Sequence, residues 1–210
     1  VSYKDGRLAY REAGKGPDLF FLHGMNGSSR SWFHIFEVLA PSFHVVAWDA
    51  PSFGASDVFG DKIEDYVDAA KALMQAVKIR EAIVVGHSMG GVIATQLAAD
   101  RECSTAGLVL SSTHLGFGLP ASAPLMARYA TRIDHIKSEG VDTAYGLERA
   151  KRSTPEGTSQ AVIRFLAEIA TGARIEGIRD GGRMSQEADN AKIGPNVRVP
   201  VLILSGGKDT

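Results

Sequence analysis

Short apolar runs alternate with one-sided amphipathic stretches over the first half of the chain, and an apolar run returns near residue 200. Continuous runs rich in Val, Ile, Leu and Phe are typical of strands that are buried on both faces of a sheet. The predicted strands cover residues 8–12, 18–22, 44–48, 82–85, 107–110 and 200–205. Because helical patterns separate most of them, we expect an α/β fold with a mostly parallel, doubly wound sheet.

The helical pattern is clearest between residues 61 and 78, where apolar side chains recur at spacings of three and four. Its apolar positions are Ile63, Tyr66, Val67, Ala70, Leu73, Met74 and Val77. This spacing predicts a helix with one buried face. Further helices are predicted over residues 31–39 and from Met89 towards Ala99.

After residue 114 the strand pattern stops, and residues 115–190 show helical spacing at 125–136 and 161–169. Breaks are predicted at Gly140, Pro155, Gly172 and Gly181-Gly182. The segment is far longer than the ~10–12 residues that one crossover connection needs at minimum, which disfavours ordinary crossover helices. We therefore expect a core of residues 1–114 and 191–210 and a helical cap insertion, 115–190, over the carboxyl edge of the sheet.

Composition narrows the class of protein. The 210 residues carry a formal net charge of -1, which gives no electrostatic reason to expect nucleic acid or an anionic membrane as a partner. No apolar run approaches the ~20 residues that span a bilayer. Cys103 is the only cysteine, so no intrachain disulfide can form, and we expect a cytoplasmic protein. Phosphate-loop, dinucleotide and zinc-protease motifs are missing, so neither a cofactor nor a metal is expected.

The stretch Gly86-His87-Ser88-Met89-Gly90-Gly91 carries the most specific chemical signal. An apolar strand enters it and a helical run leaves it, so Ser88 lies on a tight corner and must adopt a strained backbone with φ above zero. Gly86 and Gly90 stand two residues before and after it, where a Cβ would collide. The helix that follows presents free N–H groups and a dipole that favour developing negative charge at the serine.

This hexapeptide resembles the nucleophile elbow of the α/β-hydrolase family, in the form found in its cap-bearing esterases, lactonases and carbon–carbon bond hydrolases. Three other stretches resemble the same family: His23-Gly24-Met25, the loop of residues 49–56 and the strand end of residues 200–209. The loop matches the family pattern D-x-P-G-x-G-x-S except that Ser52 replaces its usual glycine. Asp49 in that loop is expected to accept hydrogen bonds that stabilise the turn.

The resemblance implies a catalytic machinery. Ser88 is the nucleophile, the backbone N–H groups of Met25 and Met89 form the oxyanion hole, and Asp209 orients a catalytic histidine. None of the six histidines fits that last role convincingly, and His114 is the least implausible. The resemblance therefore places the histidine, together with the last strand and helix of the sheet, beyond residue 210.

The expected activity is a serine hydrolase that cleaves a small ester, a lactone or an activated C–C bond through an acyl-enzyme. An acyltransferase or perhydrolase would use the same site with another acceptor. A receptor-like protein that binds a small molecule would retain the elbow but turn over slowly or not at all. A small acyl compound is the expected partner, and the sequence is compatible with a homo-oligomer. One of the eight arginines between residues 115 and 190 could clamp a substrate carboxylate, but the sequence does not say which.

Overall fold

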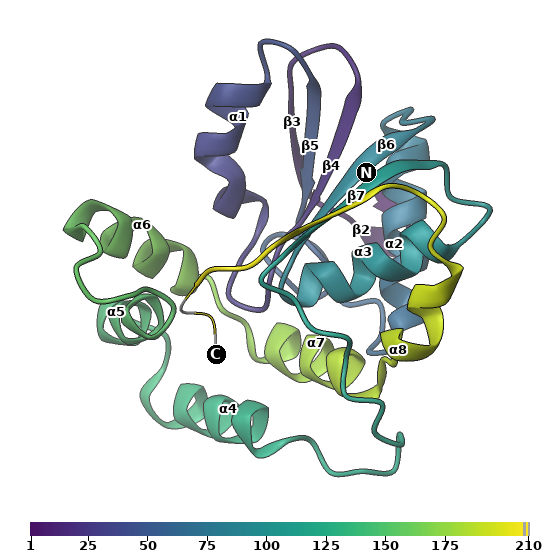
Figure 1. The fold of residues 1–210 in the computed structure, drawn as a ribbon. Coiled ribbons are helices and arrows are strands. Elements are labelled where there is room, and N and C mark those ends of the chain that lie inside the picture. The colour runs from purple at the N-terminus through teal and green to yellow at the C-terminus, as the bar shows by residue number, and fades with distance from the viewer. Residues whose placement is uncertain (208, 210) are drawn as a thin grey trace.

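The computed structural model describes residues 1–207 and 209 of the chain. Within these residues, six strands form one sheet in the order β3-β5-β4-β6-β7-β8, and a separate hairpin, β1-β2, precedes it (Figure 1). β3 is antiparallel to β5, whereas every other neighbouring pair is parallel. The strands are β1 (Ser2–Tyr3), β2 (Gly6–Arg7), β3 (Tyr10–Ala13), β4 (Asp18–Leu22), β5 (His44–Trp48), β6 (Ala82–His87), β7 (Thr105–Ser111) and β8 (Val201–Leu204). The sheet is thus mostly parallel, as predicted.

Helices cover both faces of this sheet and also extend past one edge of it. The helices are α1 (Phe33–Leu39), α2 (Ile63–Ala76), α3 (Met89–Ala99), α4 (Ala127–Glu139), α5 (Thr143–Arg152), α6 (Gln160–Ala170), α7 (Ile175–Glu187) and α8 (Asn190–Ile193), with short 3-10 helices η1 (Ser29–Trp32) and η2 (Gly194–Asn196). None of the helices in the described part of the chain combines the length and the apolar character that a bilayer crossing requires.

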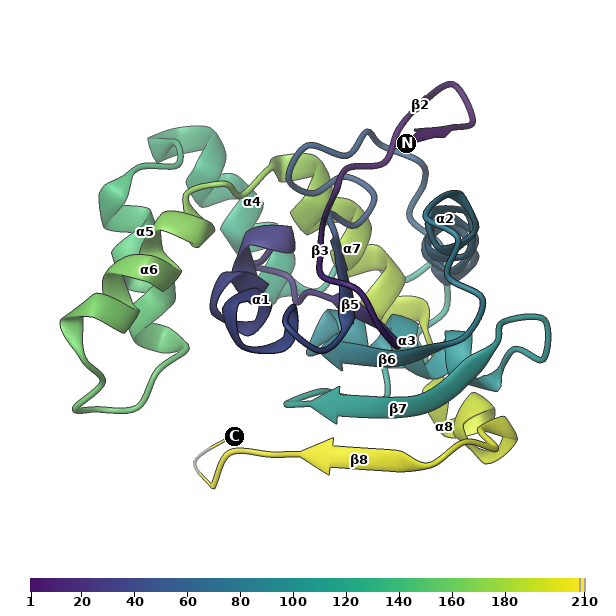
Figure 2. The ribbon, with the colours of Figure 1, turned by 90° about the horizontal axis from the view of Figure 1, so that it is seen from above.

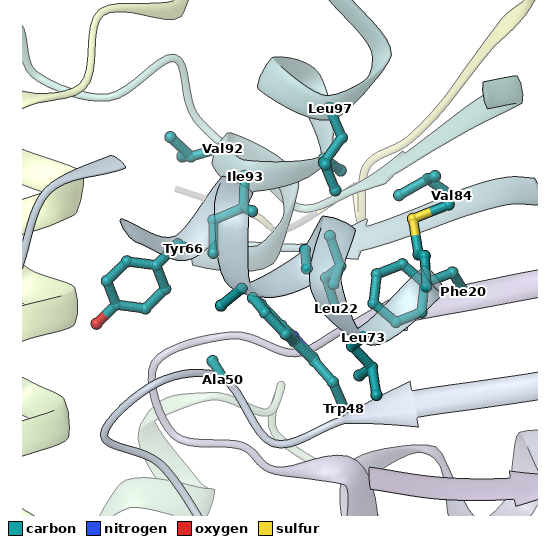
Figure 3. Close-up of a cluster of buried hydrophobic side chains, with 14 of the residues drawn as sticks. Phe20, Leu22, Trp48, Ala50, Tyr66, Leu73, Val84, Val92, Ile93 and Leu97 are labelled. Atoms are coloured by element: carbon teal, nitrogen blue, oxygen red, sulfur yellow. The ribbon is translucent and has the colours of Figure 1, made fainter. Parts of the chain in front are cut away.

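The main hydrophobic core lies between the sheet and the helices α2 and α3 (Figure 3). Alternate residues of β4 show why: Phe20 and Leu22 face this core, whereas Leu19 and Phe21 face the opposite side, where α1 packs. The fully buried side chains of the main core include Phe20, Leu22, Trp48, Tyr66, Leu73, Val84, Ile93 and Leu97. Burying one such side chain contributes roughly 1.5–3 kcal/mol, so this face fixes the register of the strands.

Helices α4 to α7 gather beyond the edge at which the parallel strands end (Figure 1). In the view of Figure 2, the arrowheads of β7 and β8 point towards the side on which α4, α5 and α6 lie. Residues 115–190 form no named strand in the described structure. The two ends of the segment are held together by an isolated β-bridge between Gly116 and Asp189 and by further backbone hydrogen bonds beside it.

Two predictions about these elements are wrong in detail. The strand predicted over residues 8–12 is divided, because Leu8 turns into the core between β2 and β3. The break predicted at Gly181-Gly182 lies inside α7. A Cβ on Gly181 would come 2.8 Å from Met89 Sδ, and one on Gly182 would come 2.8 Å from Tyr129 Cγ. These glycines therefore permit close helix packing and do not end the helix. Neither α5 nor α7 was predicted as a helix.

Candidate active site

Ser88 occupies the corner between β6 and α3 with φ 51° and ψ −119°, a backbone conformation that non-glycine residues rarely adopt. Gly86 and Gly90, on either side of Ser88, must be glycine because a Cβ would collide with backbone atoms. A Cβ on Gly86 would come 2.5 Å from the Gly90 carbonyl oxygen, and one on Gly90 would come 2.1 Å from the Leu22 carbonyl oxygen. The steric reason given for the G-x-S-x-G spacing is therefore confirmed.

The loop after β4 lies directly against this corner. A Cβ on Gly24 would come 3.1 Å from Ser88 Cβ and 2.9 Å from His87 Nδ1, so a larger residue there would force His87 or Ser88 to shift. Within residues 1–207 and 209, neither the Met25 N–H nor the Met89 N–H donates a hydrogen bond to a protein acceptor. Two main-chain donors thus have no protein acceptor, and they belong to the residues from which the resemblance takes its oxyanion hole.

His23 holds the loop in place. Its side chain is fully buried, its Nε2 accepts a hydrogen bond of 3.0 Å from the Ala50 N–H, and its Nδ1 lies 2.8 Å from the Gly24 carbonyl oxygen. Burial lowers the pKa of His23, which favours the neutral ring with its proton on Nδ1. This histidine therefore braces the loop between β4 and β5, and it has no free nitrogen with which to act as a base.

Asp209 follows β8 at the same edge of the sheet as Ser88, because β6, β7 and β8 are adjacent and parallel. Its Oδ2 accepts hydrogen bonds from the Ser112 hydroxyl at 2.6 Å and from the Gly206 N–H at 3.0 Å, and both contacts lower the pKa of its carboxyl group. Two strand spacings of ~4.8 Å separate β8 from β6. A bridging side chain is thus needed to connect Asp209 with Ser88.

None of the six histidines makes that bridge in the described structure. His87 stands next to Ser88 and is an exposed residue. The surrounding protein lowers the pKa of His87, which the nearby Asp209 carboxylate opposes. His114 uses its Nδ1 to accept a 3.0 Å hydrogen bond from the Gly116 N–H, and its ring lies 5.1 Å from that of Phe117. His114 Nδ1, the atom that would donate to Asp209 in a triad, is therefore already engaged by the Gly116 N–H.

The loop of residues 49–56 supports the site from the β5 side. Asp49 accepts hydrogen bonds from the Ser29 N–H at 2.7 Å and the Ala55 N–H at 2.9 Å, which confirms its predicted role as a turn acceptor. Ser52 adopts φ 70°, the left-handed conformation for which the family pattern uses glycine. Its buried hydroxyl donates to Asp180 Oδ2 on α7 at 2.8 Å, so the departure from the pattern creates a link between the loop and α7.

Residues 19–210 match a protein-family model that is described as the Alpha/beta hydrolase family. The chain belongs to this family. It is 34% identical over 227 aligned residues to an uncharacterized protein of Mycobacterium tuberculosis, which covers 97% of the chain and 64% of that protein. It is 35% identical over 115 residues to the dihydrolipoyllysine-residue acetyltransferase component of the acetoin cleaving system of Cupriavidus necator, over 53% of the chain and 30% of that protein. The chain thus spans less than two thirds of the length of either relative.

Among solved structures, this α/β-hydrolase is similar to the enol-lactonase of Burkholderia xenovorans LB400. The TM-score is 0.78 at 23% sequence identity, and the match covers 96% of the chain and 78% of the lactonase. At this level of identity the comparison shows the shared fold. It confirms the α/β architecture with its mostly parallel sheet.

Sequence reasoning missed two polar residues of this α/β-hydrolase that contact the candidate site. Ser112 binds Asp209, and Thr113 donates from its hydroxyl to the Ser88 carbonyl oxygen at 2.6 Å. Both directly follow β7, the strand between the two candidate catalytic residues. Their place at the carboxyl end of a central strand was the available signal.

Proposed function

We propose that this α/β-hydrolase is a serine hydrolase that cleaves a small ester, a lactone or an activated C–C bond through an acyl-enzyme on Ser88. The observation that carries the proposal is the strained corner at Ser88 together with the two free amides of Met25 and Met89. Strained backbone persists where the surrounding structure over-determines it, and it clusters at active sites.

In the proposed reaction, Ser88 Oγ attacks the carbonyl carbon of the substrate while a histidine takes the hydroxyl proton. The Met25 and Met89 N–H groups donate to the oxyanion, a contribution that typically amounts to about 10²–10³ in rate per donor. The leaving group departs with the proton from the histidine. Water then attacks the acyl-enzyme, regenerates Ser88 and releases the acid.

Asp209 has the proposed role of orienting that histidine. The hydrogen bonds from Ser112 and Gly206 keep its carboxyl group ionised, which suits an acceptor for an imidazole N–H. Because no described histidine bridges Asp209 and Ser88, we assign the base to a histidine that follows residue 210. Residues 115–190 are proposed as the cap that covers the pocket, since their helices gather at this edge of the sheet.

The test is labelling of the full-length protein with a fluorophosphonate probe, followed by peptide mapping. We expect label on Ser88, none on the Ser88→Ala variant, and a loss of p-nitrophenyl butyrate turnover of about 10³-fold or more in that variant. A matched control is Ser104→Ala, which changes a serine away from this edge. Turnover that survives in Ser88→Ala, or ligand binding without any labelling, would overturn the assignment.

An acyltransferase is the second candidate, favoured by the identity to the acetyltransferase component of Cupriavidus necator. It would form the same acyl-enzyme and pass the acyl group to an alcohol or a thiol in place of water. Product analysis with an ester substrate and rising concentrations of a competing alcohol separates the two. Free acid as the dominant product supports the hydrolase, and ester exchange at low alcohol concentration supports the transferase.

A further inference from the structure

Arg132 is an unusually buried arginine in the segment proposed as the cap. It lies on the inner face of α4 and is only 8% exposed. Its Nε donates to the Tyr145 hydroxyl at 2.6 Å, and its guanidinium carbon lies 5.7 Å from the centre of the Tyr145 ring. Its Nη2 is shut off from solvent and has no hydrogen-bond acceptor among the described residues. Among the described residues, the Tyr145 hydroxyl is thus the only hydrogen-bond partner of the Arg132 guanidinium.

A second arginine lies within electrostatic reach of the first. Arg149 stands one helical turn after Tyr145 on α5, and its Nε is also buried without an acceptor in the described part of the chain. Burial lowers the pKa of Arg149, and the positive charge of Arg132 lowers it further. Each of the two guanidinium groups therefore has one nitrogen that is buried without an acceptor in the described structure, and a buried positive charge is costly unless an anion accompanies it.

Other arginines of the same segment show the contrast. Each of four pairs with a carboxylate: Arg152 with Glu148, Arg174 with Glu176, Arg179 with Asp180 and Arg183 with Glu187. Within residues 1–207 and 209, no carboxylate forms an ion pair with Arg132 or Arg149. Arg128 and Arg164 also form no ion pair in this part of the chain, but both are exposed. Arginine nitrogens that are buried without an acceptor therefore occur, among the described residues, only on Arg132 and Arg149.

This junction adjoins the candidate active site. Tyr145 belongs to an apolar cluster formed with Tyr129, Ile133, Ile136 and Ile178, and Met25 of the oxyanion loop packs against that cluster. Figure 1 shows α4 and α5 at the side of the molecule that faces the ends of the strands. The oxyanion loop and the α4–α5 junction are thus in contact with the same apolar cluster.

We propose that Arg132 and Arg149 form a binding site for a small anion, above all a carboxylate, between α4 and α5. The planar guanidinium fork matches a carboxylate in geometry and charge, and a desolvated pair binds it strongly. The carboxylate has two conceivable sources, the substrate itself or a free anion in solution. If the carboxylate belongs to the substrate, this protein is selective for esters or lactones that carry an additional, anionic group. That selectivity rests on the proposed function.

The first arm of the test measures substrate selectivity in the full-length protein. We compare kcat/KM for p-nitrophenyl hemisuccinate, which is anionic, with that for p-nitrophenyl butyrate, which is neutral and of similar length. Loss of one charge-assisted contact predicts that Arg132→Gln lowers the anionic-to-neutral ratio about tenfold or more. Arg149→Gln lowers it less, and Arg132→Lys gives an intermediate value because it keeps the charge and loses the fork. Arg152→Gln, an exposed control on α5, leaves the ratio unchanged.

The second arm measures the melting temperature as sodium acetate is titrated at constant ionic strength, and it needs no catalysis. A saturable rise in the wild type that disappears in Arg132→Gln or Arg149→Gln supports the anion site even where the ratio of the first arm is unchanged, and identifies a free anion as the ligand. If neither the ratio nor the acetate response depends on either arginine, the proposal is wrong. If the fluorophosphonate probe does not label Ser88 in the wild type but the acetate response is intact, only the proposed function is overturned.

Discussion

The two edges of the parallel sheet differ in how their backbones are held. At the carboxyl edge, a serine with positive φ follows each of three strands: Ser52 at 70° after β5, Ser88 at 51° after β6 and Ser112 at 43° after β7. At the amino edge, side-chain ion pairs join neighbouring strands: His44 on β5 contacts Asp18 on β4 and Glu12 on β3. Residues in such strained conformations cost of order 1–3 kcal/mol each. The strain is thus concentrated on the edge where the candidate chemistry lies.

Positive φ elsewhere has a local explanation. Lys4 turns the β1-β2 hairpin, and Lys78 follows the end of α2, where a left-handed residue commonly terminates a helix. None of the three serines turns a hairpin or follows the C-terminus of a helix. Each has a side-chain or main-chain contact with another element instead: Ser52 with α7, Ser88 with β7, and Ser112 with Asp209. Each of these serines therefore links its loop to a second part of the structure at the carboxyl edge.

The largest effect is expected from Gly90→Ala. The new Cβ would lie 2.1 Å from the Leu22 carbonyl oxygen and 2.8 Å from that of His23, so the start of α3 must move. A displacement of about 1 Å in the nucleophile costs roughly 10²-fold in rate, and overpacking costs about 1–3 kcal/mol in stability. Ester turnover and urea unfolding of the purified variant measure the two effects.

Gly107→Ala is the control for that change. Gly107 lies on β7, where a Cβ would meet nothing closer than 3.7 Å, an ordinary contact. Its activity should stay within about twofold of wild type, since the new methyl group moves no backbone. Equal losses in both variants would show that the elbow is no more constrained than the middle of a strand.

The next largest effect is expected from Ser112→Ala, which removes the hydroxyl that binds Asp209. The carboxylate keeps only the Gly206 N–H, so its position and its ionised state are both less secure. We expect kcat to fall about tenfold with little change in KM, because the orientation of the acid acts on the base and not on substrate binding. The acid limb of the pH–rate profile should also move to higher pH. An unchanged profile would separate Ser112 from the reaction.

A smaller effect, on stability, is expected from Ser52→Ala. The variant leaves Asp180 Oδ2, in a residue only 3% exposed, without its hydroxyl donor. Unsatisfied buried groups cost about 1–3 kcal/mol, which urea unfolding measures directly. The comparison is Arg30→Gln, which breaks an exposed contact with Glu168 on α6 and should cost about 1 kcal/mol or less. If the two variants are equally stable, α7 is not held more firmly to the core than α6.

How much of this could be predicted from sequence depends on how far apart the interacting residues are. The strands at 18–22 and 44–48 and the elbow match the structure closely, because apolar runs and the glycine spacing are local signals. Helix α7 was missed because its glycines serve contacts with Met89 and Tyr129, which lie far away in the chain. Contacts such as that between Arg132 and Tyr145 join two helices, and no periodicity within either helix predicts them.

The smallest effect is expected at the amino edge, where His44 contacts Asp18 through Nδ1 at 2.5 Å and Glu12 through Nε2 at 2.8 Å. Burial opposes the charge on His44, but the hydrogen bonds to Asp18 and Glu12 outweigh it and raise its pKa. A raised folded-state pKa means that the stabilisation is fully present below the unfolded value of about 6.5 and is lost as the pH rises through the folded value.

His44→Gln should therefore be less stable than wild type by about 1 kcal/mol at pH 5.5, and the difference should shrink as the pH rises above 6.5. Urea unfolding at intervals of half a pH unit measures this dependence. Asp18→Asn is the matched control, because it removes one partner of the ring and should flatten the same dependence. Ester turnover at a fixed pH should be unchanged in both variants, since neither touches the carboxyl edge. A loss of turnover in His44→Gln at full stability would mean that the two edges are coupled, and the contrast between a strained functional edge and an ionic structural edge would then be wrong.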